Sequence, residues 1–272
     1  MAGDSEDPNG AVQYHLAVGP DDVAPTVLLP GNPERVDNIT ALWEESEHVA
    51  HHREYRTATG RYDGTPVSVT STGIGSPSAA IAVEELARVG VDTLLRVGSC
   101  GAIQPEIEVG DLVVTSGAVR QEGTSDEYVR EDYPAAASHE AVSALVAAAE
   151  RLGYDYHVGV TASTDSFYAG QGRPGFSGFT AAGSEDLIDE LRGANVKNVE
   201  MEASAILTLA SLYGLRAGSV CTVYADRTSG EFRIEGESRA AETASLAASL
   251  LARMDEVKRE AGVDAWHAGL SL

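Results

Sequence analysis

Short runs of β-branched and aliphatic residues alternate with Ala-rich segments along almost the whole chain, and this alternation limits the fold more than any other feature. Two early β-rich runs, 53–61 and 66–70, are joined by Asp63-Gly64, a dipeptide that favours a hairpin turn. The remaining predicted strands are 26–29, 93–97, 111–115, 157–162 and 217–224, and the predicted helices are 33–43, 79–89, 138–152, 184–192, 203–213 and 237–261. Strands mixed with helices and one hairpin predict an α/β fold of three layers, α/β/α, around a central mixed, strongly bent sheet.

No internal repeat and no linker interrupts this pattern, so residues 14–272 are predicted to form a single domain. Residues 1–13 are polar and acidic and are predicted to be a disordered tail. The first residues carry acids rather than a basic start followed by an apolar run, which argues against a signal peptide. No apolar segment reaches the roughly 18 residues that a membrane span needs. We therefore expect a cytoplasmic protein.

The chain has 42 acidic and 19 basic residues, and its formal net charge is −23. A field of this sign repels nucleic acid and anionic membranes, so neither is an expected partner. Lys197 and Lys258 are the only lysines, and an acidic surface with so little lysine predicts a halophilic protein, because carboxylates keep a protein hydrated in molar salt. Cys100 and Cys221 stand in apolar surroundings and are predicted to be buried thiols rather than a disulfide.

The segment 198–204 places two carboxylates, Glu200 and Glu202, on either side of Met201. In an extended segment alternate side chains face the same way, so the two carboxylates would share one face. Like charges repel unless donors lie between them, and the hydroxyls of a sugar diol are such donors, with the Met packed on the apolar face of the sugar. The alternative is a solvated strand edge that leads into a helix, where Glu suits the positive end of the dipole.

Two other segments have the composition of anion sites. In Pro30–Arg35 a strand ends in a glycine turn before a helix, so backbone N–H groups and the arginine could hold an anion. The alternative is a plain strand-to-helix connection with a surface arginine. In the run 96–101, Arg96 and Ser99 end a predicted buried strand, and an arginine is rarely placed there without a partner. This favours a second anion clamp.

Two Gly-rich segments complete the set of motifs. The run 71–78 has Gly73 and Gly75 but lacks the third glycine of a dinucleotide fingerprint, so a nicotinamide cofactor is not expected. Gln171 and Arg173 flank a glycine and offer an amide and a guanidinium side by side, which could read the carbonyl edge of a flat heterocycle. The alternative is a mobile loop without a ligand.

From about Tyr14 to Leu251 the chain resembles the nucleoside phosphorylases, and within them the uridine-cleaving members. The resemblance rests on motifs that follow one another in the same order: Tyr14–Leu16, Leu29–Val36, His52–Tyr55, Ser71–Gly75, Leu95–Gly98, Phe167–Arg173 and Val199–Glu202. Each motif is weak alone, but the ordered set is highly specific. The resemblance implies a pentosyltransferase that uses inorganic phosphate to cleave the N-glycosidic bond of a ribonucleoside, giving free base and ribose 1-phosphate, with no other cofactor.

The resemblance also implies a role for each matching position. Phosphate would be held by Gly31, Arg35, Arg53, Arg96 and Ser99, with Arg53 coming from a neighbouring subunit. Ribose would be held by His15, Glu200, Met201 and Glu202, with His15 coming from a neighbour. The base would contact Phe167, Gln171, Arg173, Asp226 and Arg227. The expected catalytic residues are Arg96, Glu202 and Arg173.

A cation and an oligomer follow from the same resemblance. Glu54, Ile74 and Ser78 match positions at which such enzymes hold a monovalent cation, for example K+, at a dimer interface. Sites shared between subunits imply an obligate homo-oligomer, expected to be a hexamer built as a trimer of dimers.

The residues leave the identity of the base open. Uracil offers one N–H between two carbonyl acceptors, which suits Gln171 and Arg173, so uridine is the favoured substrate. Guanine offers two N–H donors that a carboxylate such as Asp226 would accept, which makes a guanosine phosphorylase the alternative unless Asp226 pairs with Arg227. Tyr224 is also larger than the aliphatic residue expected at that wall. A nucleosidase or a non-catalytic nucleoside-binding protein would not need the predicted phosphate-binding arginines.

Overall fold

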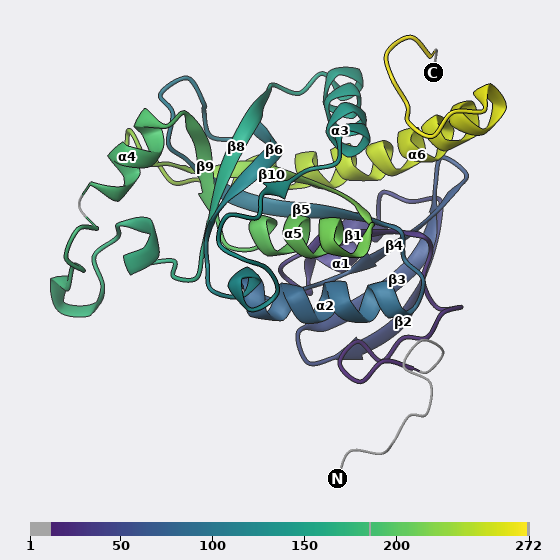
Figure 1. Ribbon diagram of the computed structural model, residues 1–272, viewed down its shortest axis with the longest axis horizontal. Coiled ribbons are helices and arrows are strands. Elements are labelled where there is room, and N and C mark those ends of the chain that lie inside the picture. Colours follow the sequence, from purple (N-terminus) through teal and green to yellow (C-terminus); the bar gives the residue numbers. More distant parts are fainter. Residues whose placement is uncertain (1–11, 185, 271–272) are drawn as a thin grey trace.

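The computed structural model describes residues 12–184 and 186–270, which form a ten-stranded sheet with helices on both of its faces (Figure 1). The strands are β1 (Thr26–Pro30), β2 (Glu45–His52), β3 (Tyr55–Tyr62), β4 (Thr65–Thr70), β5 (Thr93–Ala102), β6 (Leu112–Gln121), β7 (Ala135–Ala136), β8 (Tyr156–Thr164), β9 (Val196–Glu200) and β10 (Arg216–Asp226). The α-helices are α1 (Arg35–Thr40), α2 (Ser76–Arg88), α3 (His139–Leu152), α4 (Leu187–Gly193), α5 (Ala203–Tyr213) and α6 (Glu237–Ala261).

Strand β5 is the centre of the sheet. It pairs in parallel with β1 over Thr93–Val97 on one edge and with β10 along the other edge. Beyond Val97, the edge of β5 that pairs with β1 pairs with β9, antiparallel, through Gly101 and Ala102. From β9 the pairing runs through β8 and β6 back to β10, so this side of the sheet closes on itself, whereas β4, β3 and β2 extend it beyond β1. Between the residues of β5 that pair with β1 and those that pair with β9, this edge of the strand lines a cavity.

The helices pack on the sheet through two large apolar clusters. Helices α1, α3 and α6 cover one face and enclose Leu28 and Leu95, whereas α2 and α5 cover the other and enclose Val27 and Leu94 (Figure 1). Successive side chains of a strand face opposite sides, which is why neighbouring residues belong to different clusters. This arrangement confirms the predicted three-layer α/β/α fold with a mixed, bent sheet.

Several predicted boundaries change. Strand β2 is absent from the predicted elements, because its polar residues are largely exposed at the edge of the sheet, where it pairs with β3. The predicted helix 33–43 is helical only over Arg35–Thr40, and the predicted helix 184–192 begins at Leu187, with residue 185 outside the described residues. Residues 1–11 of the predicted tail also lie outside the described residues, whereas Gln13 is buried and its N–H donates to the Val18 carbonyl at 2.8 Å.

Other sequence predictions can be compared directly. The hairpin turn at Asp63-Gly64 is confirmed, with φ of 50° and 69° at the two residues. Cys100 and Cys221 are buried free thiols, as predicted. Within the part of the chain that the structure describes, no helix is long and apolar enough to cross a bilayer.

Candidate active site

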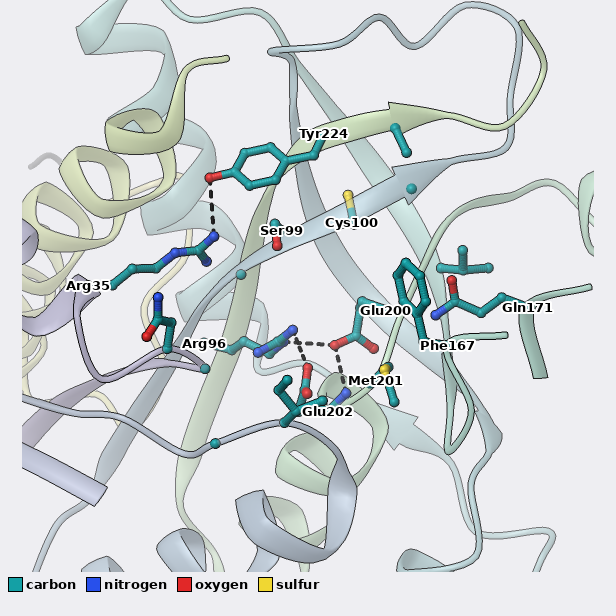
Figure 2. A pocket seen from close by; sticks show the side chains of 18 of the residues that line it. Arg35, Arg96, Ser99, Cys100, Phe167, Gln171, Glu200, Met201, Glu202 and Tyr224 are labelled. Carbon is teal, nitrogen blue, oxygen red and sulfur yellow. Dashed lines mark hydrogen bonds and ion pairs between the residues drawn. The ribbon is translucent and has the colours of Figure 1, made fainter. Parts of the chain in front are cut away.

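A cavity of about 610 Å³ opens at the carboxyl ends of β1, β5, β9 and β10 (Figure 2). Crevices at the carboxyl ends of strands are common ligand sites in α/β folds. The cavity brings together most of the residues that the sequence analysis selected. Those that line it are Gly31, Arg35, Glu54, Ile74, Arg96, Ser99, Phe167, Gln171, Arg173, Glu200, Met201 and Glu202.

Two glycine-rich turns form one wall of this cavity. The turn after β1 and the turn after β4 lie against each other, since the Gly73 N–H donates to the Gly31 carbonyl at 2.9 Å. A Cβ at Gly31 would lie 3.2 Å from the Gly73 carbonyl oxygen, and Gly73 itself has a φ of 72°. The two turns can therefore approach each other only because both positions are glycine, and their backbone atoms line the cavity.

Arg96 connects the sheet to the acidic motif. Its side chain is almost completely buried, its Nε donates to Glu200 Oε2 at 2.8 Å, and its Nη2 forms an ion pair with Glu202 Oε2 (Figure 2). Burial alone would lower the pKa of Arg96, but the two carboxylates outweigh burial and raise it. The partner that an arginine in a core strand requires is therefore a pair of glutamates.

The two glutamates differ from the predicted arrangement. They do not alternate along one strand: Glu200 is the last residue of β9, whereas Glu202 is the N-cap of α5. Glu200 Oε2 accepts the N–H groups of Glu202 at 2.8 Å and Ala203 at 2.9 Å, so it satisfies donors at the start of α5. The prediction of one shared strand face is wrong, because the chain turns between the two residues and Arg96 draws their carboxylates together.

Each carboxylate has a further donor. Ser163 on β8 donates its hydroxyl to Glu200 Oε1, and the Gly75 N–H donates to Glu202 Oε1 at 2.5 Å. Burial raises the pKa of Glu202 even though Arg96 opposes the rise. Donors from β5, β8 and the turn before α2 thus fix both side chains at the floor of the cavity.

The opposite side of the cavity contains Arg35 and Tyr224. Arg35 Nη2 donates to the Tyr224 hydroxyl at 3.2 Å, and Arg35 Nε lies 3.3 Å from Glu237 Oε1. Figure 2 shows Arg35, Ser99 and Arg96 around the same part of the cavity. Two arginines and a hydroxyl around one space are groups that could hold a multiply charged oxyanion.

A third group of residues lies at the open end. Phe167 stacks under the Arg173 guanidinium, with 4.5 Å between the guanidinium carbon and the ring centroid, and Gln171 is buried beside them. Arg227 Nη2 donates to the Gln171 carbonyl at 2.9 Å. Arg173 Nε and Arg227 Nη1 are buried without a hydrogen-bond partner in the described part of the chain. Burial, followed by the charge of Arg173, lowers the pKa of Arg227 to about 10.

Asp226 does not join this group. Its carboxylate accepts the Thr228 N–H at 2.7 Å and the Ser229 hydroxyl at 2.5 Å, within its own turn. Burial alone would raise the pKa of Asp226, but the hydrogen bonds from Ser229 and Thr228 lower it. The alternative of an Asp226–Arg227 ion pair is wrong, since the described residues show no such contact.

Four other selected residues lie outside the cavity lining. Arg227 is behind Gln171, and Ser78 donates to Glu54 Oε1 at 3.1 Å beside the turn at Gly73. His15 is held through its Nδ1, which lies 2.7 Å from Glu85 Oε1, and Arg53 lies over the ring of Tyr14. The side chains of His15 and Arg53 are thus on the outer surface beside β2 and β3 rather than in this chain's own cavity.

Two residues of the site, Phe232 and Ser163, are absent from the sequence-based prediction. Phe232 lines the cavity although 65% of it is exposed, and it forms a β-bridge to Ala225. Its signal was available, because Phe232 is a lone aromatic in a polar stretch. Ser163 gave no signal, since only the register of β8 against β9 places it opposite Glu200.

Comparison with known proteins agrees with this geometry. Residues 25–254 match the family model described as the phosphorylase superfamily, and the chain belongs to that superfamily. It is 58% identical to the uridine phosphorylase of Thermococcus kodakarensis over 259 residues, which covers 95% of this chain and 94% of the relative. It is 46% identical to the guanosine phosphorylase of Halorubrum lacusprofundi (81% and 86% covered) and 45% identical to the uridine phosphorylase of Escherichia coli (80% and 87% covered). The predicted family and enzyme class, a pentosyltransferase of the nucleoside phosphorylase type, are confirmed.

Proposed function

We propose that this protein is a uridine phosphorylase, which converts uridine and inorganic phosphate to uracil and ribose 1-phosphate. The observation that carries the proposal is the position of Arg96, which contacts both Glu200 and Glu202 and also faces the space near Arg35 and Ser99. One guanidinium thus lies between a site for an oxyanion and a site for sugar hydroxyls. A reaction that joins phosphate to C1′ of ribose requires these two sites to be adjacent.

Phosphate is the group assigned to the space between the two arginines. Arg35 and Arg96 would neutralise its charge, Ser99 would donate a hydroxyl, and the turn at Gly31 would bring backbone close to it. Arginine suits this task because its fixed fork of donors matches phosphate oxygens. Held in this way, the phosphate oxygen is positioned for attack, which replaces a bimolecular encounter by an oriented one.

Ribose is assigned to the acidic motif. Met201 would pack on the sugar ring, while Glu202 and Glu200 would accept hydrogen bonds from its 2′- and 3′-hydroxyls. As the glycosidic bond breaks, the sugar gains positive character, and the nearby carboxylates favour that charge. Both carboxylates are already fixed by Arg96 and backbone N–H groups, so they need little rearrangement during the reaction.

The base is assigned to the group at the open end of the cavity. The bond between C1′ and the uracil nitrogen breaks with its electron pair going to the base, so negative charge develops on the two uracil carbonyls. Arg173 and Gln171, which line the cavity, would donate to these oxygens, Arg227 would hold Gln171 from behind, and Phe167 would stack on the ring. Donors that meet the charge only as it forms stabilise the transition state more than the ground state.

The position of Asp226 supports uridine over guanosine. Guanine recognition would need an acceptor for its N1–H and N2–H groups, and the Asp226 carboxylate is already engaged by Thr228 and Ser229. Because the chain is also similar to a guanosine phosphorylase, guanosine is the alternative substrate that the experiment must test.

We infer a homo-oligomer, a hexamer built as a trimer of dimers, in which His15 and Arg53 complete the site of a neighbouring subunit. The exposed Tyr14 and Ile74 support such an interface. Glu54, Ile74 and Ser78 are assigned to a monovalent cation such as K+ at that interface, and the reaction is proposed to need no cofactor besides phosphate. The net charge of −23 supports a halophilic protein, and a cytoplasmic location stays a prediction of the sequence.

The test is base release from an equimolar mixture of uridine and guanosine in molar KCl, with and without phosphate. Phosphate-dependent release of uracil is the expected result. Release of guanine would keep the phosphate and ribose sites and move base recognition to Asp226. Release without phosphate would indicate a nucleosidase, and no release at all would indicate a non-catalytic binding protein.

A further inference from the structure

Arg35 lies between two cavities. It lines the substrate cavity, and it also lines a second cavity of about 360 Å³ that contains Asn38, Glu237 and Ser238. Gly98 is the other residue common to both linings. The Arg35 side chain therefore has open space on both of its sides, which is unusual for a group expected to hold phosphate in one place.

The two partners of Arg35 line different cavities, although the Tyr224 hydroxyl is close enough to Glu237 to form a hydrogen bond with it. The Tyr224 hydroxyl accepts from Arg35 Nη2 at 3.2 Å and belongs to the substrate cavity, whereas Glu237 Oε1 lies 3.3 Å from Arg35 Nε and belongs to the second cavity. Tyr224 is buried, but 45% of the Glu237 side chain is exposed. The bond to Glu237 is long and exposed, so it is the one that a competing anion can replace at small cost.

The Tyr224 hydroxyl stays protonated at every pH at which the protein would work. Burial raises the pKa of Tyr224 to about 12, and the Glu237 carboxylate adds to the rise while Arg35 opposes it. A neutral hydroxyl accepts from the arginine without neutralising its charge, and its own hydrogen is directed to the Glu237 carboxylate. Glu237, by contrast, neutralises Arg35 and repels a phosphate dianion that approaches the same guanidinium.

From these contacts we propose that Glu237 competes with phosphate for Arg35, and that Tyr224 positions the Arg35 guanidinium so that it can exchange one anion for the other. With the substrate cavity empty, Arg35 is held between Tyr224 and Glu237. When phosphate enters, Arg35 keeps its bond to Tyr224 and turns its remaining donors from Glu237 to the phosphate. Glu237 thereby sets the phosphate concentration at which the enzyme is half saturated. This inference rests on the assignment of phosphate to the space beside Arg35.

The first test is the phosphate dependence of turnover in Glu237→Gln. Because an exposed ion pair is weak, the variant is expected to reach half saturation at a phosphate concentration lower by about two- to five-fold. The half-saturating uridine concentration should stay unchanged, and the difference from the wild type should shrink as KCl rises, since salt screens exposed charges. Glu256→Gln on the same helix is the matched control, because it removes an equal charge from an exposed position away from Arg35.

The second test separates positioning from general electrostatics. Tyr224→Phe removes the hydroxyl on the substrate side, so Arg35 is expected to stay with Glu237 and the half-saturating phosphate concentration should rise. Tyr224→Phe should raise the half-saturating phosphate concentration by a smaller factor in the Glu237→Gln background than in the wild type, because the competing carboxylate is absent. A merely structural role of Tyr224 would lower the turnover rate without this dependence on Glu237.

The proposed function and the competition for Arg35 can be overturned separately. If wild-type turnover does not depend on phosphate, the proposed function is overturned. If turnover depends on phosphate but Glu237→Gln and Glu256→Gln have the same half-saturating phosphate concentration, the competition is overturned and the proposed function stands. Calorimetric titration of both variants with inorganic phosphate alone gives the same comparison without catalysis.

Discussion

Arg96 Nε donates to Glu200 Oε2 at 2.8 Å, and this same carboxylate oxygen accepts the first free N–H groups of helix α5. One ion pair thus ties the central strand of the sheet to the start of a helix. Removing either partner leaves a buried charge that has lost its ion pair, and such losses typically cost about 3–5 kcal/mol. Under the proposed function the same arginine also serves catalysis, so stability and activity are expected to change together at this position.

Replacement of Arg96 is expected to affect both properties. Arg96→Ala should reduce kcat/KM for uridine by at least about 100-fold, since it removes a phosphate donor and frees both glutamates. It should also lower the thermal unfolding midpoint measured by circular dichroism. Arg96→Lys should recover part of the stability but little activity, because one ammonium cannot reproduce the fork of donors. Arg151→Ala, at an exposed position of α3, is the control, and near-normal turnover of Arg96→Ala would refute the phosphate assignment.

The role of Glu202 can be tested with a change in the substrate. Glu202→Ala is expected to lower kcat/KM for uridine by about 100-fold, because the sugar loses its orientation. If Glu202 binds the 2′-hydroxyl, the loss should be much smaller with 2′-deoxyuridine, which lacks that group. Steady-state kinetics with both substrates measure the difference. An equal loss with both would show that Glu202 acts through Arg96 rather than through the sugar.

The sequence predicted the buried parts of the fold because burial leaves a pattern. Strands such as β5 and β10 are apolar and β-branched, and α5 is apolar all round, so their residues identify them. Strand β2 gave no such pattern, since an exposed edge strand contains residues that a loop also accepts. The closure of the sheet through the pairing of β10 with both β5 and β6 could not be predicted, because it depends on strand bending rather than on composition.

The candidate site was predictable as a set of residue types but not as a geometry. The sequence indicated Arg96, Glu200 and Glu202 separately, yet their mutual contact depends on β5 lying beside β9. The orientation of Asp226 was equally hidden, since it is decided by whether Thr228 and Ser229 fold back onto its carboxylate. Contacts between distant elements and within irregular turns are the two kinds of information that local patterns lack.

A cluster far from the cavity should control stability in acid. Burial alone would raise the pKa of Glu140, but hydrogen bonds from the backbone N–H of Trp266 and from the side chains of Lys258 and Arg216 lower it below its ordinary value of 4.5. The folded state therefore binds this proton less readily than the unfolded chain. The stability that Glu140 contributes is present above pH 4.5 and is lost as the pH falls through the lower pKa of the folded state.

The measurement is the thermal unfolding midpoint between pH 6 and pH 3. Glu140→Gln is expected to be less stable than the wild type at pH 6 and to lose less stability on acidification. Glu131→Gln, at an exposed position without an ion pair in the described residues, should follow the wild-type curve. Parallel curves for Glu140→Gln and the wild type would show that other carboxyl groups account for the acid sensitivity.

Salt dependence follows from the net charge of −23. Repulsion between exposed carboxylates opposes the compact state, and its range falls from about 10 Å at 0.1 M salt to about 3 Å at 1 M. The fold is therefore expected to be lost reversibly when KCl is diluted from molar to millimolar concentration, as followed by circular dichroism. An equally concentrated sugar solution, which does not screen charge, should not restore it.

A variant in which Glu47, Glu131, Glu256 and Glu260 are changed to Gln should need less salt, because these residues are exposed and form no ion pair within the described part of the chain, so the change removes repulsion alone. Full stability of the wild type without salt would contradict this prediction, because it would show that the fold does not need salt to screen the repulsion between its surface carboxylates.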